Sequence, residues 1–263
     1  MKAVAVAPDG GWLATASDDG TARIWDPASG QERAVLTGHK RAVNAVAIAP
    51  DGNWLATGSR DRTARIWDPA SGQERAVLTG HKRAVNAVAV APDGSWLATG
   101  SRDQTSRIWD PSTGQEQAAL AGPQMTALGA WLEGIWLTAF AEPPGQVNAV
   151  AAGPDGSWLA VGSDDGKVRI WNLATKELLT TLTGNTGRVN TVAVAADGRW
   201  LAVGSAGIAR VWETATWQPG ALMRIDEAVV SCAWLDSSAL VLAGAAGLYA
   251  FDFTAGAAPT TSR

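Results

Sequence analysis

The sequence predicts an all-β fold, a propeller assembled from four-stranded units that repeat about every 42 residues. The chain of 263 residues holds 14 tryptophans but one tyrosine, and tryptophan at that density needs a repeated structural reason. Segment 39–80 matches segment 81–122 at 33 of 42 positions, which indicates duplication of one unit. Two tryptophan series share this period, namely Trp12, Trp54, Trp96, Trp158 and Trp200, and Trp25, Trp67, Trp109, Trp171 and Trp212.

The residue pattern of each complete unit predicts four short strands. In the second unit these are 43–49, 54–59, 63–68 and 74–78, and a Pro-Asp-Gly turn at 50–52 joins the first two. Apolar residues occupy both parities of the strands, so both faces of each sheet should be covered. Sheets that stack side by side around a ring have this property, and each unit is therefore interpreted as a propeller blade.

Counting units predicts a single domain over 1–253 with seven blade positions. Blades 3–38, 43–80, 85–122, 147–184 and 189–225 are complete, whereas segment 125–141 aligns only with the first two strands and is a half blade. Segment 229–253 supplies three strands of a last blade. The tail 254–263 is small and polar, and we expect it to be disordered.

Ring closure is a second expectation that the sequence raises. Met1 aligns with Val43, so the strand that would pair with the last blade and hide two sheet edges is missing. Two interpretations stay open: the chain is a fragment of a longer protein, or the ring closes imperfectly.

Composition excludes several classes of protein. The one cysteine, Cys232, rules out an intrachain disulfide framework or a cysteine-based metal cluster. The net charge of −4 argues against a polybasic chain, and no apolar run reaches the ~18 residues of a membrane span. With no signal peptide recognised, we expect a cytoplasmic protein, and the high use of Ala, Gly and Arg suggests a bacterial genome.

The repeated motif resembles the WD-repeat family, and the resemblance covers nearly the whole chain. Gly38-His39, Gly58-Ser59, Asp61 and Trp67-Asp68 stand where that family has its Gly-His, Gly-Ser, turn Asp and Trp-Asp. The resemblance implies a propeller, usually of seven four-stranded blades, that has no catalytic role and serves as a platform for protein partners.

Two copies of a polar set look like an acid, a base and a nucleophile. The resemblance implies instead a buried structural chain from Asp to His to Ser to the Trp indole, and the presence of two copies favours this interpretation. The first copy is His39, Ser59, Asp61 and Trp67, and the second is His81, Ser101, Asp103 and Trp109. No catalytic residue, metal site or cofactor is assigned.

A basic patch is expected on one face, where two kinds of loop emerge from adjacent blades. Its seven cations are Lys40, Arg41, Arg60, Arg62, Lys82, Arg83 and Arg102. Asp18 and Asp164 occupy the equivalent turns elsewhere, at the position before the turn Asp that the resemblance implies is a frequent partner contact. The alternative interpretation is a solvated surface copied by duplication. Trp131 of the half blade is either a binding anchor or a filler of the space left by the missing strands.

The predicted function is a non-catalytic protein–protein interaction scaffold or sensor, within a larger signalling assembly. The partner would be a protein or peptide, acidic if the basic patch binds it. The alternative is a polyanion or nucleic acid bound by the same patch, which the negative net charge disfavours. An enzyme would need convergent His, Asp or Glu residues, and both histidines are assigned to structure. No membrane or small-molecule substrate is expected.

Overall fold

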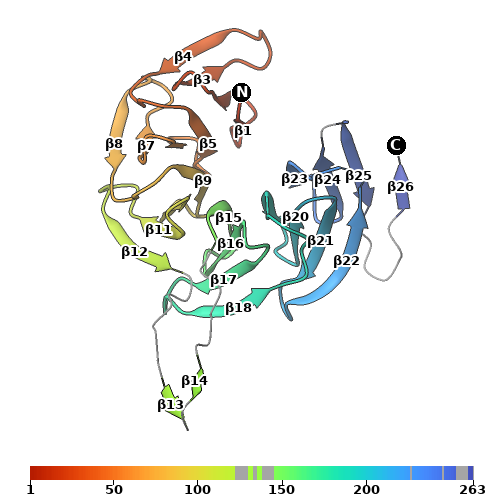
Figure 1. Ribbon diagram of the computed structural model, residues 1–263. Helices are drawn as coiled ribbons and strands as arrows, with labels where there is room; N and C mark the ends of the chain where they lie inside the picture. The colour runs from red at the N-terminus through yellow and green to blue at the C-terminus, as the bar shows by residue number, and fades with distance from the viewer. Residues whose placement is uncertain are drawn as a thin grey trace.

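The computed structural model describes residues 1–121, 130–132, 135–137, 145–225, 227–244, 246–252 and 260–262. The described part is built from strands and turns, and it holds no helix that is long and apolar enough to cross a membrane. Six four-stranded sheets stand side by side along an arc, which is the all-β propeller architecture that the repeat predicts (Figure 1).

We number these sheets as blades 1 to 6, and each is an antiparallel meander in chain order. Blade 1 holds β1 (Ala3–Val6), β2 (Leu13–Ala16), β3 (Ala22–Trp25) and β4 (Glu32–Leu36). Blade 2 holds β5 (Val43–Ile48), β6 (Leu55–Ser59), β7 (Ala64–Trp67) and β8 (Glu74–Leu78). Blade 3 holds β9 (Val85–Val90), β10 (Leu97–Ser101), β11 (Thr105–Trp109) and β12 (Glu116–Ala121).

Blade 4 holds β15 (Val147–Ala152), β16 (Trp158–Ser163), β17 (Val168–Asn172) and β18 (Leu178–Leu182). Blade 5 holds β19 (Thr191–Val194), β20 (Trp200–Gly204), β21 (Ile208–Glu213) and β22 (Gln218–Arg224). Blade 6 holds β23 (Ser231–Trp234), β24 (Ala239–Ala243), β25 (Leu248–Asp252) and β26 (Thr260–Ser262).

An Asp-Gly turn makes the first hairpin of blades 1 to 5. In blade 2 the Asp51 carboxylate accepts a hydrogen bond from the Asn53 backbone N–H at 3.0 Å. Gly52 adopts φ 70°, a left-handed conformation that glycine reaches without the steric cost of a Cβ. The turn joins β5 to β6 in the register that places Ile48 opposite Leu55.

The hydrophobic core lies between the sheets, because each of blades 2 to 5 packs one face on the blade before it and the other on the blade after it. At the first interface, Leu55 and Trp67 of blade 2 pack against Ala14, Ile24 and Leu36 of blade 1. The same arrangement recurs at the other four interfaces. Burial on both faces explains why the strands read as apolar at both parities.

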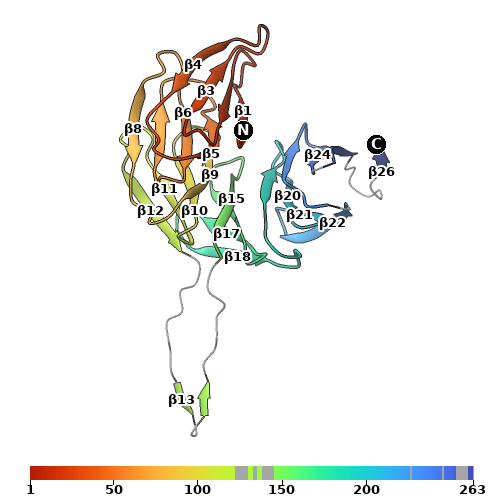
Figure 2. The ribbon, with the colours of Figure 1, turned by 45° about the horizontal axis from the view of Figure 1, so that its top comes forward.

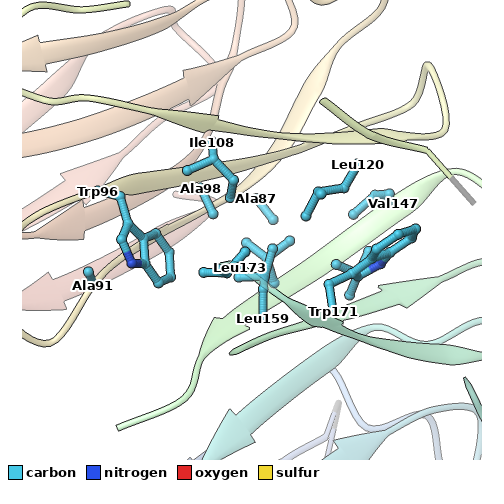
Figure 3. Close-up of a cluster of buried hydrophobic side chains, with 12 residues drawn as sticks. Ala87, Ala91, Trp96, Ala98, Ile108, Leu120, Val147, Leu159, Trp171 and Leu173 are labelled. Carbon is cyan, nitrogen blue, oxygen red and sulfur yellow. The ribbon is translucent and has the colours of Figure 1, made fainter. Parts of the chain in front are cut away.

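Blades 3 and 4 pack directly on each other, and this corrects the predicted count of seven blade positions. Ile108 and Leu120 of blade 3 share a core cluster with Leu159 and Trp171 of blade 4 (Figure 3). The half blade 125–141 is therefore not a ring position between them. Its two strands, β13 (Ala130–Leu132) and β14 (Ile135–Leu137), pair only with each other and lie away from the six blades (Figure 2). A two-stranded sheet cannot cover a four-stranded neighbour, so the complete blades meet instead.

The last blade has four strands, and the prediction of three was wrong. Its fourth strand, β26, pairs antiparallel with β25, with Phe251 opposite Thr261. This strand falls within 254–263, where the sequence predicts a disordered tail. Residues 254–259 and 263 of that tail lie outside the described residues. Backbone hydrogen bonds to an available sheet edge can order a segment whose side chains offer little to bury.

Candidate partner-binding face

In blades 2, 3 and 4, two loops are joined by backbone hydrogen bonds on one face of the propeller. The Arg60 N–H donates to the Ala42 carbonyl at 2.9 Å, which links the turn after β6 to the segment before β5. The Ser59 hydroxyl donates to the Arg41 carbonyl at 3.0 Å and reinforces the link. In blade 3 the Arg102 N–H donates to the Ala84 carbonyl at 2.9 Å.

The seven cations predicted for the patch extend from these joined loops on neighbouring blades. All seven are exposed, and none forms an ion pair within the part of the chain that the structure describes. Arg62 has φ 78°, a left-handed conformation that closes the turn and is rare for a residue with a Cβ. We call this set the basic surface, and it comprises Lys40, Arg41, Arg60, Arg62, Lys82, Arg83 and Arg102.

A buried polar network supports the basic surface from below. His39 Nδ1 lies 2.8 Å from Asp61 Oδ2, and His39 Nε2 lies 2.8 Å from Thr57 Oγ1. The Trp67 indole N–H donates to the same Thr57 hydroxyl at 2.8 Å. The ionised Asp61 carboxylate can only accept, so the proton of a neutral His39 is on Nδ1, and Nε2 then accepts from the Thr57 hydroxyl.

The bridging hydroxyl is that of threonine, which corrects the expected role of serine. Ser59 Oγ instead binds the Arg41 carbonyl and accepts from the Asp61 N–H at 3.1 Å. The β6 side chains alternate between faces, so Ser59 and Thr57 share a face, but Thr57 lies level with the histidine and indole nitrogens.

The second copy of the network follows the same correction, with Thr99 in the place expected for Ser101. Asp103 lies 2.9 Å from His81, and Thr99 lies 2.7 Å from His81 and 2.9 Å from the Trp109 indole nitrogen. Ser101 donates to the Arg83 carbonyl at 3.2 Å. The two copies therefore brace the two halves of the basic surface in the same way.

The protonation states of the network follow from burial and hydrogen bonding. Burial lowers the pKa of His39 below its usual 6.5, because a dry site disfavours the imidazolium, although Asp61 opposes this shift. Burial would raise the pKa of Asp61, but hydrogen bonds from Thr63, Lys40 and His39 outweigh it and lower that pKa to about 2. A neutral histidine held by an ionised aspartate is a structural strut, since no exposed nucleophile lies beside it.

The fourth blade lacks this histidine and uses an arginine instead. Arg169 is 5% exposed, and its guanidinium donates to Asp165 at 2.7 Å. At the matching position in blade 1, Arg23 pairs with Asp19 at 2.9 Å in a far more exposed setting. An arginine thus satisfies the turn Asp in both blades, in place of the histidine that binds it in blades 2 and 3.

The acidic positions predicted for partner contact lie in the equivalent turns of blades 1 and 4. Asp18 is exposed and forms an ion pair of 3.1 Å with Lys2. Asp164 is exposed, and its N–H donates to the Gln146 carbonyl at 3.0 Å. Trp131 pairs its backbone with Trp136 in the two-stranded sheet, and its side chain lies outside the described residues.

Two recurring residue types carry structure that the sequence interpretation missed. Thr15, Thr57 and Thr99 share the 42-residue period, and each accepts a hydrogen bond from an indole nitrogen. An asparagine ladder also joins the inner strands: the Nδ2 groups of Asn44, Asn86 and Asn190 donate to carbonyls of the next blade at 2.9, 3.0 and 2.9 Å. The recurrence of these threonines and asparagines at the same position of successive repeats was the sequence signal that could have identified both features.

The described residues offer little for chemistry. They contain no group of three or more His, Cys, Asp or Glu side chains placed to hold a metal ion. The Cys232 thiol is buried, and burial raises its pKa to about 11, so it carries a proton at neutral pH.

Comparison with known proteins gives one family and two relatives. The family model described as WD domain, G-beta repeat matches residues 1–26, 30–68, 72–110, 137–172 and 176–213. The chain is 45% identical over 49 residues to the Ribosome biogenesis protein erb1 of Botryotinia fuckeliana, which covers 18% of this chain and 6% of that protein. It is 50% identical over 38 residues to the Ribosome biogenesis protein erb1 of Aspergillus niger, which covers 14% of this chain and 5% of that protein.

These matches therefore span a small fraction of the relatives' length. Both relatives are fungal, so they lend no support to the bacterial origin that the composition suggested.

Proposed function

The chain belongs to the WD-repeat family, and we propose that it is a non-catalytic protein–protein interaction scaffold that binds an acidic partner through the basic surface. The observation that carries the proposal is the set of seven exposed cations, unpaired within the described residues, on loops that the buried networks brace. Cations that have no internal partner are available to carboxylates or phosphates of another molecule.

The braced loops favour binding because little conformational entropy is lost when they engage a partner. Asp61 accepts from the Lys40 N–H at 3.0 Å, and Asp103 accepts from the Lys82 N–H at 2.8 Å. Each network thus fixes the backbone on which the cations stand before a partner arrives. Free side-chain rotation remains, so the surface suits an extended acidic segment better than a single small anion.

The finer parts of the proposal concern the setting and the remaining contacts. We place the scaffold in the cytoplasm, as the sensor or scaffold part of a signalling assembly. Asp18 and Asp164 flank the basic surface on blades 1 and 4 and would orient a partner that also carries a basic end. Trp131 would anchor a partner at the half blade.

The test is affinity capture that compares the natural chain with the variant Arg60→Glu, Arg62→Glu and Arg102→Glu. A matched control reverses three exposed cations elsewhere, Lys176→Glu, Arg199→Glu and Arg224→Glu, and Lys176 shares the left-handed φ of Arg62. A bound protein should lose at least tenfold in affinity for the first variant and stay within about twofold for the control, where tenfold corresponds to about 1.4 kcal/mol. Equal retention by both variants would reject the basic surface.

A second candidate function is binding of a polyanion, and the printed names of the two relatives favour it. Both are ribosome biogenesis proteins, so we propose RNA as the polyanion. The same pair of variants tests it with single-stranded RNA as the probe: log affinity should fall with log salt by about 0.7 for each phosphate contacted, and the slope should shrink in the first variant. Capture that nuclease treatment abolishes would favour RNA over a protein partner.

A further inference from the structure

The face of blade 1 that points away from blade 2 is exposed. In blades 2 to 6 the preceding blade covers the matching face. Val4 is 55% exposed, whereas Val46 at the same position of blade 2 is 9% exposed. Leu13 and Trp25 are only half-buried, although their counterparts Leu55 and Trp67 are 0% and 1% exposed. We call this surface the open face, and it comprises Met1, Val4, Val6, Leu13, Thr15 and Trp25.

The open face is hollowed as well as apolar. A hollow of about 500 Å³ is lined by Met1, Leu13, Thr15 and Trp25, with Arg23 and Asp26 at its side. In blade 2 the space beside the corresponding residues is filled by Ile24 and Leu36 of the preceding blade. The hollow is therefore the unfilled half of an interface that this chain builds five times.

The repeated interface specifies what would fill the hollow. Each of the first five blades presents a tryptophan near the hairpin, a small residue in the middle and an aliphatic side chain on the third strand. In blade 1 these residues are Trp12, Ala14 and Ile24, and in blade 4 they are Trp158, Ala160 and Ile170. The alanines permit close approach of the sheets, while the larger side chains fill the space above the neighbour's tryptophan.

The free face of blade 6 has this size pattern inverted. Ala239 stands at the tryptophan position and Ala250 at the isoleucine position, while Val241, Leu235 and Leu248 replace small residues. Leu235 and Leu248 are 72% and 75% exposed. Large side chains where the sheets must approach closely, and small ones where the hollow needs filling, make a poor match for the open face.

The inner strand of blade 6 also lacks the asparagine donor that joins blades 2, 3 and 5 to the blades after them. Val230 takes the position of Asn44, Asn86 and Asn190, each of which donates to the next blade. Blades 1 and 4 also pack on the next blade without this donor, since Lys2 pairs with Asp18 and Asn148 Nδ2 has no partner among the described residues, so the inverted size pattern is what argues against blade 6. The first and last blades lie at opposite ends of the arc, in agreement with this mismatch (Figure 1). The same mismatch disfavours stacking of one copy's blade 6 on another copy's blade 1.

We infer that the open face of blade 1 is a docking surface for a β-sheet of a separate polypeptide, which binds as an additional blade. The docked side carries a tryptophan, alanines and a branched aliphatic residue in the order that this chain's own blades present. The inference depends on continuity with the five internal interfaces and uses none of the residues of the basic surface.

The first test asks whether the open face accepts a blade. A copy of residues 43–84 is joined ahead of Met1 in the full chain, because Met1 aligns with both Val43 and Val85. Amide hydrogen exchange in β1 and β2 should slow at least tenfold relative to the natural chain. A matched fusion with Ile66→Asp and Ala56→Asp in the added copy should show no such protection. Exchange that is equal in both fusions would overturn the inference.

The second test identifies the natural occupant. A photoreactive benzoylphenylalanine replaces Val6 of the full chain in its native lysate, and the same substitution at Val77, an exposed residue of blade 2, is the control. Cross-links from position 6 to a strand of another polypeptide, absent at position 77, are expected. Cross-links within one molecule, to blade 6 or to a segment of the same protein beyond residues 1–263, would show that the protein covers its own open face, and cross-links between isotopically mixed copies would show self-association. Either result, or no cross-link to another polypeptide, contradicts the inference.

The two proposals fail separately. Arg60→Glu, Arg62→Glu and Arg102→Glu should leave the cross-link at position 6 unchanged, because these turns lie on blades 2 and 3. Val4→Asp should abolish the position 6 cross-link and leave capture by the basic surface unchanged.

Discussion

The Trp67 indole nitrogen lies 2.8 Å from the Thr57 hydroxyl, and both residues are almost fully buried. That hydroxyl also satisfies His39, so one small polar side chain holds two large ring systems in place. Blades 4 and 5 carry Val161 and Val203 at this position, and in blade 5 the Trp212 indole nitrogen is buried with no partner among the described residues. The stability of the chain should therefore be unequal along the arc.

Replacement of the bridging hydroxyl should destabilise blade 2. Thr57→Val leaves His39 Nε2 and the Trp67 indole unpaired in a dry site, at a cost of about 1–3 kcal/mol. Thr57→Ser keeps the hydroxyl and should cost about 1 kcal/mol less. Urea unfolding at pH 7 measures both. Equal losses for the two variants would mean that the lost methyl or a packing change, and not the hydroxyl, controls stability.

Acid should weaken the network around His39. Its pKa is lowered in the folded state, so the unfolded chain binds a proton at a higher pH, and stability falls as pH drops below 6.5. The Asp61 carboxylate has a pKa of 3.8 in its unshifted state and about 2 in the folded chain. Its contribution to stability is therefore complete above pH 3.8 and is lost as the pH falls from 3.8 to about 2. The urea midpoint should thus decline from pH 7 to pH 5, and His39→Gln should decline less. A parallel decline in the variant would assign the effect to other groups.

Removal of the buried arginine should affect blade 4 far more than blade 1. Arg169→Met leaves Asp165, whose side chain is 11% exposed, as an uncompensated charge, at a cost of about 3–5 kcal/mol. The matched change Arg23→Met frees Asp19, which is 45% exposed, and should cost about 1 kcal/mol or less. Thermal unfolding compares the two. The double variant Arg169→Met and Asp165→Leu should recover most of the loss.

The asparagine ladder should contribute to cohesion between blades. Asn86→Ala removes the bond to the Val147 carbonyl and should lower stability by about 1 kcal/mol. Lys2→Ala changes the matching position of blade 1, where the side chain makes only a surface ion pair with Asp18, and should cost a few tenths of a kcal/mol. Hydrogen exchange of β15 amides gives a local measure, since Asn86→Ala should speed it and Lys2→Ala should not.

Local sequence patterns determined the blades and most of their strands. Val43 to Ile48 and Leu55 to Ser59 flank an Asp-Gly turn, and this short-range pattern suffices to make a hairpin in the copies of the repeat that carry it. The resemblance to WD repeats also implied that Asp61, His39 and Trp67 belong to one network, and the structure confirms their connection through Thr57.

Only the tertiary structure decided which hydroxyl bridges the network, how many blades enclose the core and where the arc ends. Thr57 and Ser59 lie on the same face of β6, and the distance to the two rings selects between them. The half blade is excluded because Leu159 and Trp171 pack directly on Ile108 and Leu120. These outcomes depend on contacts between segments far apart in the chain, and repeated local patterns carry no information on which of two competing sheets will cover a given face.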